Sequence, residues 1–270
     1  MREVRAIVQL EVPETDVELA ADALWQGSPS AVSEEPLGGG RVRLTADVVE
    51  RARIDPRWPV EVLALDGEAY LDEWRAWAAP VRVGRRILLQ PAWLPRAGEP
   101  DGDLTIVLDP GRSFGSGSHA STRLVLTVLE DVIAGGEQIL DVGCGSGVLA
   151  IAACRLGAAA AVALDVDPVA VKTTQANAAA NGVGDRLAAS VEDLAAVAET
   201  FDVVVANIGV GVLRDVAPAL VERLRPGGLL VLAGLLVDQV DEVLARCRGC
   251  VELERRAEDG WSAPVLRRVC

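Results

Sequence analysis

The feature that most constrains this chain is a run of three glycines at alternate positions, Gly143, Gly145 and Gly147. An apolar, strand-like segment that ends at Asp141 precedes them, and a helical pattern over Val148–Leu156 follows them. Glycines between a strand and a helix let a ligand approach the backbone closely at the N-terminus of that helix. The pattern therefore predicts an α/β sheet with a ligand site at the end of one strand.

The same alternation of strand-like and helical patterns continues along residues 101–270. Apolar runs that each precede a helical pattern lie at 106–108, 138–141, 161–165, 202–206 and 229–233. Such alternation is typical of a parallel sheet with helices on both faces. We therefore predict a Rossmann-like α/β domain over residues 101–270, and we expect all of these runs to lie in its sheet.

The residues ahead of that domain follow a different pattern. Strands are expected at 4–12, 31–35, 41–46 and 60–65, and helices over about 15–25 and 47–54. The first helix begins with a capping box, Thr15 to Glu18, and residues 38–40 suit a hairpin turn. The order β-α-β-β-α-β is that of a ferredoxin-like fold. We therefore predict a small α+β domain over residues 1–66 and a proline-punctuated connector over residues 67–100.

The spacing of the glycines distinguishes between two kinds of cofactor. Gly143, Gly145 and Gly147 follow G-x-G-x-G, whereas dinucleotide-binding folds use G-x-G-x-x-G and place a pyrophosphate at the helix N-terminus. S-adenosylmethionine has no phosphate. It carries an ammonium and a sulfonium, and an acid at the strand end, here Asp141, suits those cationic groups. The loop therefore favours S-adenosylmethionine, with Asp141, Gly143 and Gly145 as candidate contacts.

Two further polar residues end later strands. Asp165 lies 22 residues after Gly143, where an acid can accept hydrogen bonds from both ribose hydroxyls of an adenosine cofactor. The alternative role for Asp165 is a helix N-cap, although Asp167, which precedes a proline, fits that role better. Asn207 ends the fourth apolar run, so its amide oxygen could accept from an amine, or its side chain could cap the following helix. Asp165 and Asn207 are thus candidates for contacts to the cofactor and to the acceptor.

The formal net charge of −14 narrows the choice of partners. A strongly acidic surface repels phosphate backbones and anionic membranes, so we expect neither direct nucleic-acid binding nor membrane binding. A basic protein or a cationic small molecule would instead be attracted.

The compartment is indicated by what the chain lacks. Its first ten residues carry charges and show no signal peptide, and its longest apolar stretch, at about 229–237, is too short to span a bilayer. Five cysteines, an odd count, favour reduced thiols, and we expect a cytoplasmic protein. Cys247 and Cys250 form a lone CxxC, which with one histidine in the chain favours neither a zinc site nor a redox site, so we expect no metal.

Beyond these separate signals, the chain closely resembles one family, the ribosomal protein L-eleven methyltransferases (PrmA family). The narrowest match is Phe-Gly-Ser-Gly-Ser-His at 114–119 together with Ala-Asn-Ile at 206–208, because the G-x-G-x-G loop alone is shared by many methyltransferases. The resemblance covers the chain from about Glu73 onward, whereas residues 1–66 match in topology more than in sequence. The matching segments are 108–122, 141–150, 165–168, Asn177, 181–183 and 203–208.

The resemblance implies a class I methyltransferase domain with a seven-stranded, mostly parallel sheet, behind a ferredoxin-like domain that docks the ribosomal protein. It implies S-adenosyl-L-methionine as the methyl donor and lysine or N-terminal amines of ribosomal protein L-eleven as acceptors. Thr122, Gly143, Asp165 and Asn207 match the cofactor contacts of the family. We expect Asn207 also to orient the acceptor amine, which makes it the catalytic residue, and we expect the protein to be a monomer.

The chain departs from the family pattern beside the expected acceptor site. Gly209 and Val210 stand where the family usually has Leu-Ala, and Ser116 replaces a usual Thr. A methyltransferase of the same fold that acts on another protein or on a small-molecule amine is therefore the main alternative. A nicotinamide oxidoreductase, opposed by the glycine spacing, and an inactive cofactor-binding scaffold are the others. His119 either assists the amine or the cofactor as a neutral imidazole or fixes the backbone by hydrogen bonding, and we favour the second role.

Overall fold

The protein is described by a computed structural model, which divides into two compact units, Met1–Ala78 and Ala79–Cys270. The structure describes residues 6–25, 32–48, 57–58, 60–64, 79–95, 102–109 and 119–269. Residues 79–95, which we placed in the connector, belong to the second unit. Each unit is considered by itself.

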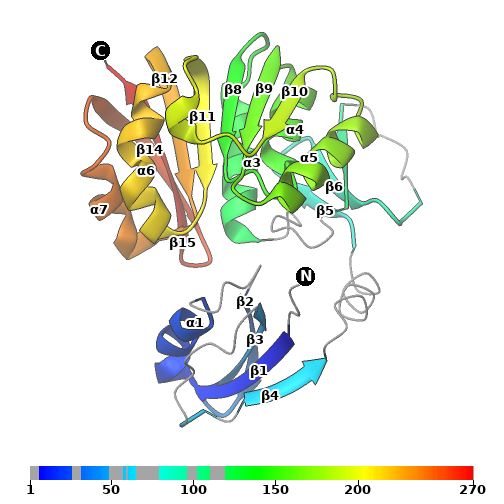
Figure 1. The fold of residues 1–270 in the computed structure, drawn as a ribbon, viewed down its shortest axis with the longest axis vertical. Helices are drawn as coiled ribbons and strands as arrows, with labels where there is room; N and C mark the ends of the chain where they lie inside the picture. Colours follow the sequence, from blue (N-terminus) through cyan, green and yellow to red (C-terminus); the bar gives the residue numbers. More distant parts are fainter. Residues whose placement is uncertain are drawn as a thin grey trace. The chain divides into compact units, whose positions relative to one another are not determined.

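The first unit contains a sheet with strand order β2-β3-β1-β4, in which every neighbouring pair is antiparallel. This is the order of a ferredoxin-like sheet (Figure 1). A 3-10 turn, η1 (Glu14–Asp16), leads into the first helix. The expected capping box depends on the side chain of Glu18, which the structure does not describe. The second expected helix, at 47–54, begins in β3 and otherwise lies outside the described residues. The elements are β1 (Ala6–Pro13), α1 (Val17–Trp25), β2 (Val32–Gly38), β3 (Arg41–Val48) and β4 (Val60–Ala64).

Alternation along the strands of the first unit separates its core from its surface. In β1 and β3, Leu10 lies opposite Leu44 and Val12 opposite Val42, and all four are buried. Helix α1 covers them through Ala20 and Leu24. The expected hairpin turn at 38–40 is confirmed, because Gly38, which ends β2, and the turn residues Gly39 and Gly40 all have positive φ.

The second unit is built on a large sheet of strand order β10-β9-β8-β11-β12-β15-β13, with β14 paired to β15 (Figure 1). Five adjacent strands from β10 to β12 are parallel, and β15 runs antiparallel to β12. The expected mostly parallel, Rossmann-like sheet is thus confirmed, with two-residue β13 as an eighth strand. Its strands are β8 (Gln138–Val142), β9 (Ala160–Leu164), β10 (Leu187–Ser190), β11 (Phe201–Asn207), β12 (Leu224–Ala233), β13 (Leu235–Leu236), β14 (Cys250–Glu258) and β15 (Trp261–Arg268).

Helices cover both faces of this sheet, because its central strands are apolar on both sides. In β11, Val203 and Val205 join a core with α3, α4 and α5, whereas Val204 and Ala206 join a core with α6 and α7. The helices are α3 (Ala120–Val132), α4 (Val148–Leu156), α5 (Pro168–Ala180), α6 (Val210–Glu222) and α7 (Val240–Leu244), with 3-10 turns η2 (Leu194–Ala196) and η3 (Val237–Gln239). Among the described residues, no helix is both long and apolar enough to cross a membrane.

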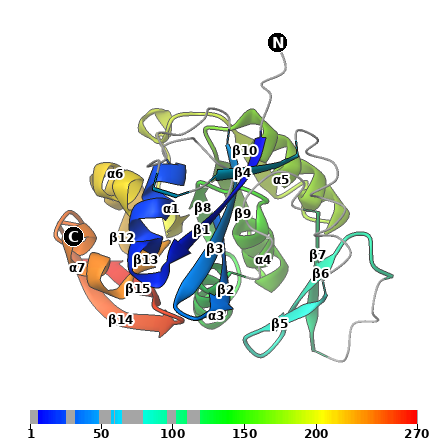
Figure 2. The same cartoon turned by 90° about the horizontal axis from the view of Figure 1, so that it is seen from below.

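One expectation about the sheet was wrong. The apolar run at 106–108 lies in β7 (Leu104–Leu108), which joins β5 (Val81–Val83) and β6 (Ile87–Pro91) in a separate three-stranded sheet (Figure 2). Strand β6 pairs with one edge of β7, and at the other edge the Asn181 side chain bonds the backbone of Val107. Both edges of β7 are therefore engaged, although Ile106 and Leu108 still pack into the core below α3 and α4.

Candidate functional site

The candidate site lies where the order of the large sheet reverses. The chain continues from β8 to β9 and β10 on one side, and β11 and β12 lie on the other. In open α/β sheets, ligands bind outside the carboxyl ends of the strands at such a switch point. The glycine loop follows β8 at this point, and its contact with a cofactor stays a prediction.

Two glycines of the loop combine a positive φ with close contacts to neighbouring side chains. Gly143 and Gly147 have φ of 77° and 81°. A Cβ on Gly143 would overlap the side chain of Ile208, and a Cβ on Gly147 would lie 2.7 Å from Cγ2 of Thr174. Both positions therefore exclude larger residues for two reasons, backbone conformation and space.

Asp165 stands beside this loop, just past the end of β9. One oxygen of its carboxylate accepts from Gly145 N at 2.9 Å, and the other accepts from Asp167 N at 2.9 Å. The N-cap of α5 is Asp167, whose carboxylate accepts from Val169 N at 2.8 Å. The capping role therefore belongs to Asp167, and the partly exposed carboxylate of Asp165 lies at the edge of the glycine loop.

Asp141 lies beneath the loop and is fully buried. Its Oδ2 accepts from Ala150 N, in the first turn of α4, at 3.2 Å, and its Oδ1 has no partner among the described residues. Burial, reinforced by the nearby charge of Asp165, raises the pKa of Asp141 to about 7. The structure thus shows Asp141 bonded to the helix that follows the loop, and its expected contact with the cofactor stays a prediction.

Asn207 and Thr122 meet at the same edge, although 85 residues separate them in the chain. Asn207 ends β11, and its Nδ2 donates to Oγ1 of Thr122 in the first turn of α3 at 3.2 Å. The N-cap of the following helix α6 is Gly209, so Asn207 does not cap that helix. No donor among the described residues reaches the amide oxygen of Asn207, which is the group that could accept from an amine.

The start of α3, which carries Thr122, is fixed from two sides. His119 is the N-cap of α3, and its Nδ1 accepts from Ser121 N at 3.3 Å. Its ring packs edge-on against Trp261 with centroids 4.7 Å apart. Burial, with the charge of Arg123, lowers the pKa of His119, which favours the neutral imidazole. These contacts support the role of His119 in fixing the backbone. Arg123 also pairs with Glu258 at 2.7 Å.

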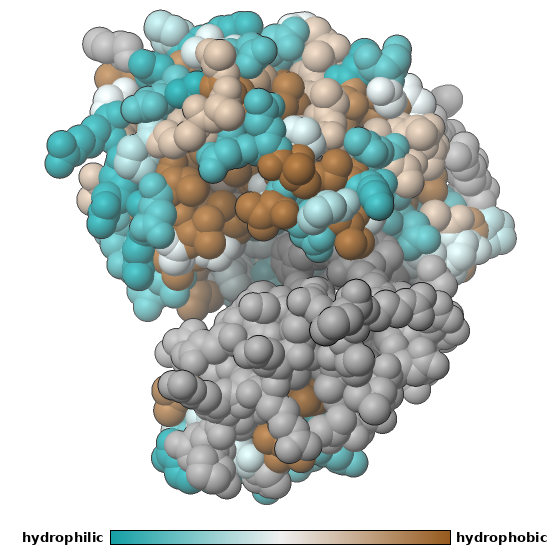
Figure 3. Space-filling model, in the orientation of Figure 1, coloured by the Kyte–Doolittle hydropathy of each residue, from teal (hydrophilic) through white to brown (hydrophobic). Residues whose placement is uncertain are grey.

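Two residues at this edge were missed by the sequence analysis. Val166 follows Asp165 and is 97% exposed, and Thr174 in α5 is fully buried with its hydroxyl donating to Gly145 O at 3.0 Å. An exposed apolar residue directly after a strand-end acid, and a Thr on the inner face of α5, were the available signals. Apolar groups also gather among polar ones on the face of the second unit seen in Figure 3.

The cysteines of the CxxC lie in the core and at its margin. Burial raises the pKa of Cys247 to about 12, and burial also raises the pKa of Cys250. Cys247 Sγ donates to Val243 O at 3.6 Å. Both thiols are thus protonated at neutral pH, which is typical of structural cysteines.

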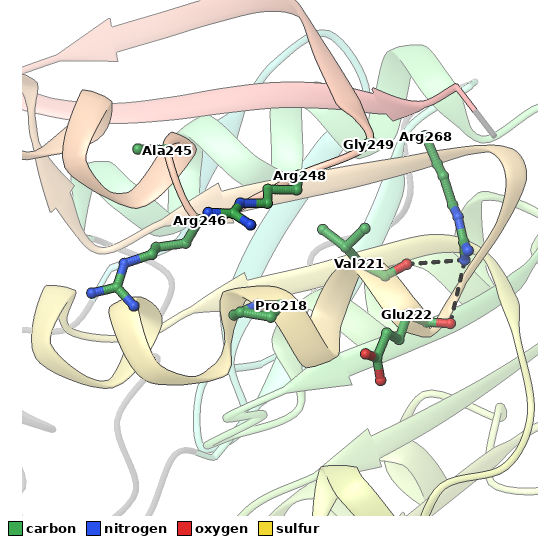
Figure 4. Close-up of a pocket in the computed structure, with 8 residues that line it drawn as sticks. All are labelled: Pro218, Val221, Glu222, Ala245, Arg246, Arg248, Gly249 and Arg268. Atoms are coloured by element: carbon green, nitrogen blue, oxygen red, sulfur yellow. Dashed lines mark hydrogen bonds between the residues drawn. The ribbon is translucent and has the colours of Figure 1, made fainter.

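A pocket of about 430 Å³ lies elsewhere, at the C-terminal end of α6 (Figure 4). Arg268 Nη1 donates there to Val221 O at 3.1 Å and to Glu222 O at 3.4 Å, so its cation caps the negative end of the helix. Helix α6 runs from the carboxyl end of β11 back toward the start of β12. The pocket therefore lies at the opposite edge of the sheet from the glycine loop and is not part of the candidate site.

The sheet order and the G-x-G-x-G loop at its switch point are those of class I S-adenosylmethionine-dependent methyltransferases. The profile of one family, ribosomal protein L11 methyltransferase (PrmA), matches residues 43–268. The chain belongs to this family, and it is accordingly an S-adenosylmethionine-dependent methyltransferase.

Individual relatives agree with the family profile. A ribosomal protein L11 methyltransferase of Pelobacter propionicus is 40% identical over 77% of this chain and 69% of the relative. One of Symbiobacterium thermophilum is 34% identical over 94% of this chain and 82% of the relative. The crystal structure of a ribosomal protein L11 methylase of Lactobacillus delbrueckii superposes with a TM-score of 0.65 at 28% identity, and covers 72% of this chain and all of that one.

Proposed function

We propose that this enzyme transfers methyl groups to lysine or N-terminal amines of ribosomal protein L11, and that Asn207 orients the acceptor amine. The observation that carries the proposal is the pairing of Asn207 with Thr122 at the carboxyl edge of the sheet, next to the glycine loop. The names of the relatives support the choice of acceptor protein.

The residues at this edge fit S-adenosylmethionine. The carboxylate of Asp165 can accept from both ribose hydroxyls, and the exposed side chain of Val166 offers an apolar surface to the adenine. Gly143 and Gly145 let the cofactor lie against the backbone, and the unpartnered oxygen of Asp141 is directed at the cationic end of the ligand in this proposal.

In methyl transfer, the main task of the protein is to position the acceptor amine. The sulfonium of bound S-adenosylmethionine supplies an already activated methyl group. The acceptor must be an uncharged amine in line with that methyl group, and a free lysine has a pKa of about 10.4. Desolvation favours the neutral amine. The amide oxygen of Asn207 can accept a hydrogen bond from an N–H group of that amine. Thr122 holds the amide by its nitrogen, which leaves the oxygen to meet the amine.

We further propose that the first unit recognises the protein substrate. One face of its sheet is charged, because Arg43 pairs with Glu11 at 2.9 Å and with Glu35 at 2.9 Å across neighbouring strands. The net charge of −14 favours a basic protein as partner. The family profile begins only at residue 43, so this role rests on the fold and the charge of the unit.

The proposal is tested with purified ribosomal protein L11 and labelled S-adenosylmethionine, with the methylated residues identified by mass spectrometry. We expect methyl groups on lysine or N-terminal nitrogens of L11 and none on another basic ribosomal protein. Free lysine and small amines are assayed in parallel. Faster methylation of a small amine than of L11 would show that the acceptor is wrong while the cofactor site is right.

A further inference from the structure

Helix α5 turns a buried polar face toward the candidate site. Thr174 and Asn177 are three residues apart on one side of the helix, and Asn181, four residues further on, is its C-cap. Asn177 is 4% exposed and Asn181 is 6% exposed. Buried amides lower stability unless they are fully hydrogen-bonded, so the partners of these side chains indicate what the face is for.

The two asparagines hold the end of β7 in the same way. Asn177 Oδ1 accepts from Asp109 N at 3.0 Å, and its Nδ2 donates to Asp109 O at 3.1 Å. Asn181 Oδ1 accepts from Val107 N at 2.8 Å, and its Nδ2 donates to Val107 O at 2.7 Å. Each amide therefore replaces one residue of a neighbouring strand, at the edge of β7 that does not pair with β6 and at Asp109 just beyond it.

The two side chains differ in their third bond. Asn177 Nδ2 also donates to Ser146 O, in the glycine loop, at 2.9 Å. Asn181 Nδ2 instead donates to the backbone oxygen of Asn177 at 2.8 Å, within the region of α5 itself. Of these two amides, only that of Asn177 links Asp109, at the end of β7, to the glycine loop.

Thr174 bonds the preceding carbonyl of the same loop, Gly145 O, at 3.0 Å. Side chains of α5 thus hold two successive peptide units of the glycine loop, those with the carbonyls of Gly145 and Ser146. Because a peptide unit is planar, fixing its carbonyl also fixes the direction of the N–H on the other side of the bond. The surface that the loop presents toward a ligand is therefore set by side chains that do not touch the ligand.

We infer that Asn177 is a positioning residue for methyl transfer. It acts through Ser146 O on the loop that holds the cofactor, and it ties that loop to Asp109, from which the chain leads on to His119 and Thr122. Asn181 is the purely structural counterpart. The inference rests on the proposed placement of the cofactor at the glycine loop.

The test compares Asn177→Ala with the matched control Asn181→Ala. Each variant removes one buried amide with three hydrogen bonds, from α5 or from its C-cap, so both should lose similar stability in thermal melts. Cofactor affinity should separate them. Calorimetry below both melting temperatures should show S-adenosylmethionine binding weakened roughly tenfold in Asn177→Ala and less than about threefold in Asn181→Ala. Equal affinities in the two variants would overturn the inference.

Two milder variants keep the test decisive if an alanine variant does not fold. Asn177→Ser keeps a small polar group and buries no charge, but it is too short to bond both Asp109 and Ser146 O, so it should bind the cofactor as weakly as Asn177→Ala. Thr174→Val removes the hydroxyl bond to Gly145 O at nearly constant size and should weaken binding about threefold. Unchanged affinity in both would also overturn the inference. A parent enzyme that binds no S-adenosylmethionine would instead contradict the proposed cofactor site.

Discussion

The two units of this protein bury different kinds of side chain. Among the described residues, the first unit buries only apolar side chains, such as Leu10 and Leu44, whereas the second also buries Asp141, Thr174 and Asn177. Polar groups inside a protein lower stability unless they are partnered, and when partnered they specify one backbone geometry. The second unit must hold a glycine-rich loop in one shape, which apolar packing alone does not do. A unit that serves as a docking surface has no such requirement.

This contrast separates binding of the protein substrate, assigned to the first unit, from binding of the cofactor, assigned to the second. The largest expected effect comes from removing the first unit. A protein that begins at Ala79 should bind S-adenosylmethionine within about twofold of the parent affinity but lose at least about a hundredfold in methylation of L11. Calorimetry and the methylation assay measure the two quantities, with circular dichroism as a control for folding. A truncated enzyme that methylates L11 at the parent rate would remove the recognition role from the first unit.

Within the second unit, the next largest effect is expected at Asn207. If its amide oxygen orients the amine, Asn207→Ala should reduce turnover about a hundredfold and weaken cofactor binding only severalfold, because the contact acts mainly in the transition state. Turnover, cofactor affinity and melting temperature are measured on the same sample. A variant that is less stable but turns over normally would mean that the side chain serves the fold alone.

A smaller effect should distinguish the two acids after β9. Asp165→Ala removes the proposed ribose acceptor and the partner of Gly145 N, and should weaken cofactor binding at least about tenfold. Asp167→Ala removes only the N-cap of α5, and should lower the free energy of unfolding by about 1 kcal/mol with cofactor affinity unchanged. Similar affinities in the two variants would contradict the assignment of the ribose contact to Asp165.

The smallest effect concerns pH and the buried carboxyl group of Asp141. Its pKa is raised from 3.8 to about 7 in the folded protein, so the folded state retains a proton that the unfolded state has lost. The contribution of this group to the free energy of unfolding therefore falls as pH rises from about 4 to 7 and stays constant above that range. Asp141→Asn should make the free energy of unfolding depend less on pH. The variant should therefore compare more favourably with the parent at pH 8 than at pH 5. Urea unfolding at the two pH values measures the difference, and parallel pH profiles for parent and variant would show that the pKa is not raised.

Local sequence patterns were sufficient for most of the architecture. Strand alternation in β1 and β3 and the apolar runs of β8 and β11 predicted the core, because which residues must be buried is set by side-chain period alone. The positive φ of the hairpin glycines and of Gly143 could be anticipated for the same local reason. The apolar run at 106–108 did not show that β7 lies in a separate sheet, because an apolar run carries no information about which strand it pairs with.

The sequence by itself determined which chemical groups stand at the strand ends: the glycine loop, Asp165 and Asn207. Only the tertiary structure decided how those groups are used. Residue spacing favoured Asp167 over Asp165 as the N-cap of α5, but it did not reveal that Thr122 holds the amide of Asn207 across 85 residues or that Asn177 bonds the glycine loop. The physical reason is that burial and backbone period are properties of a segment, whereas a hydrogen bond between distant side chains exists only after the sheet has brought them to one edge.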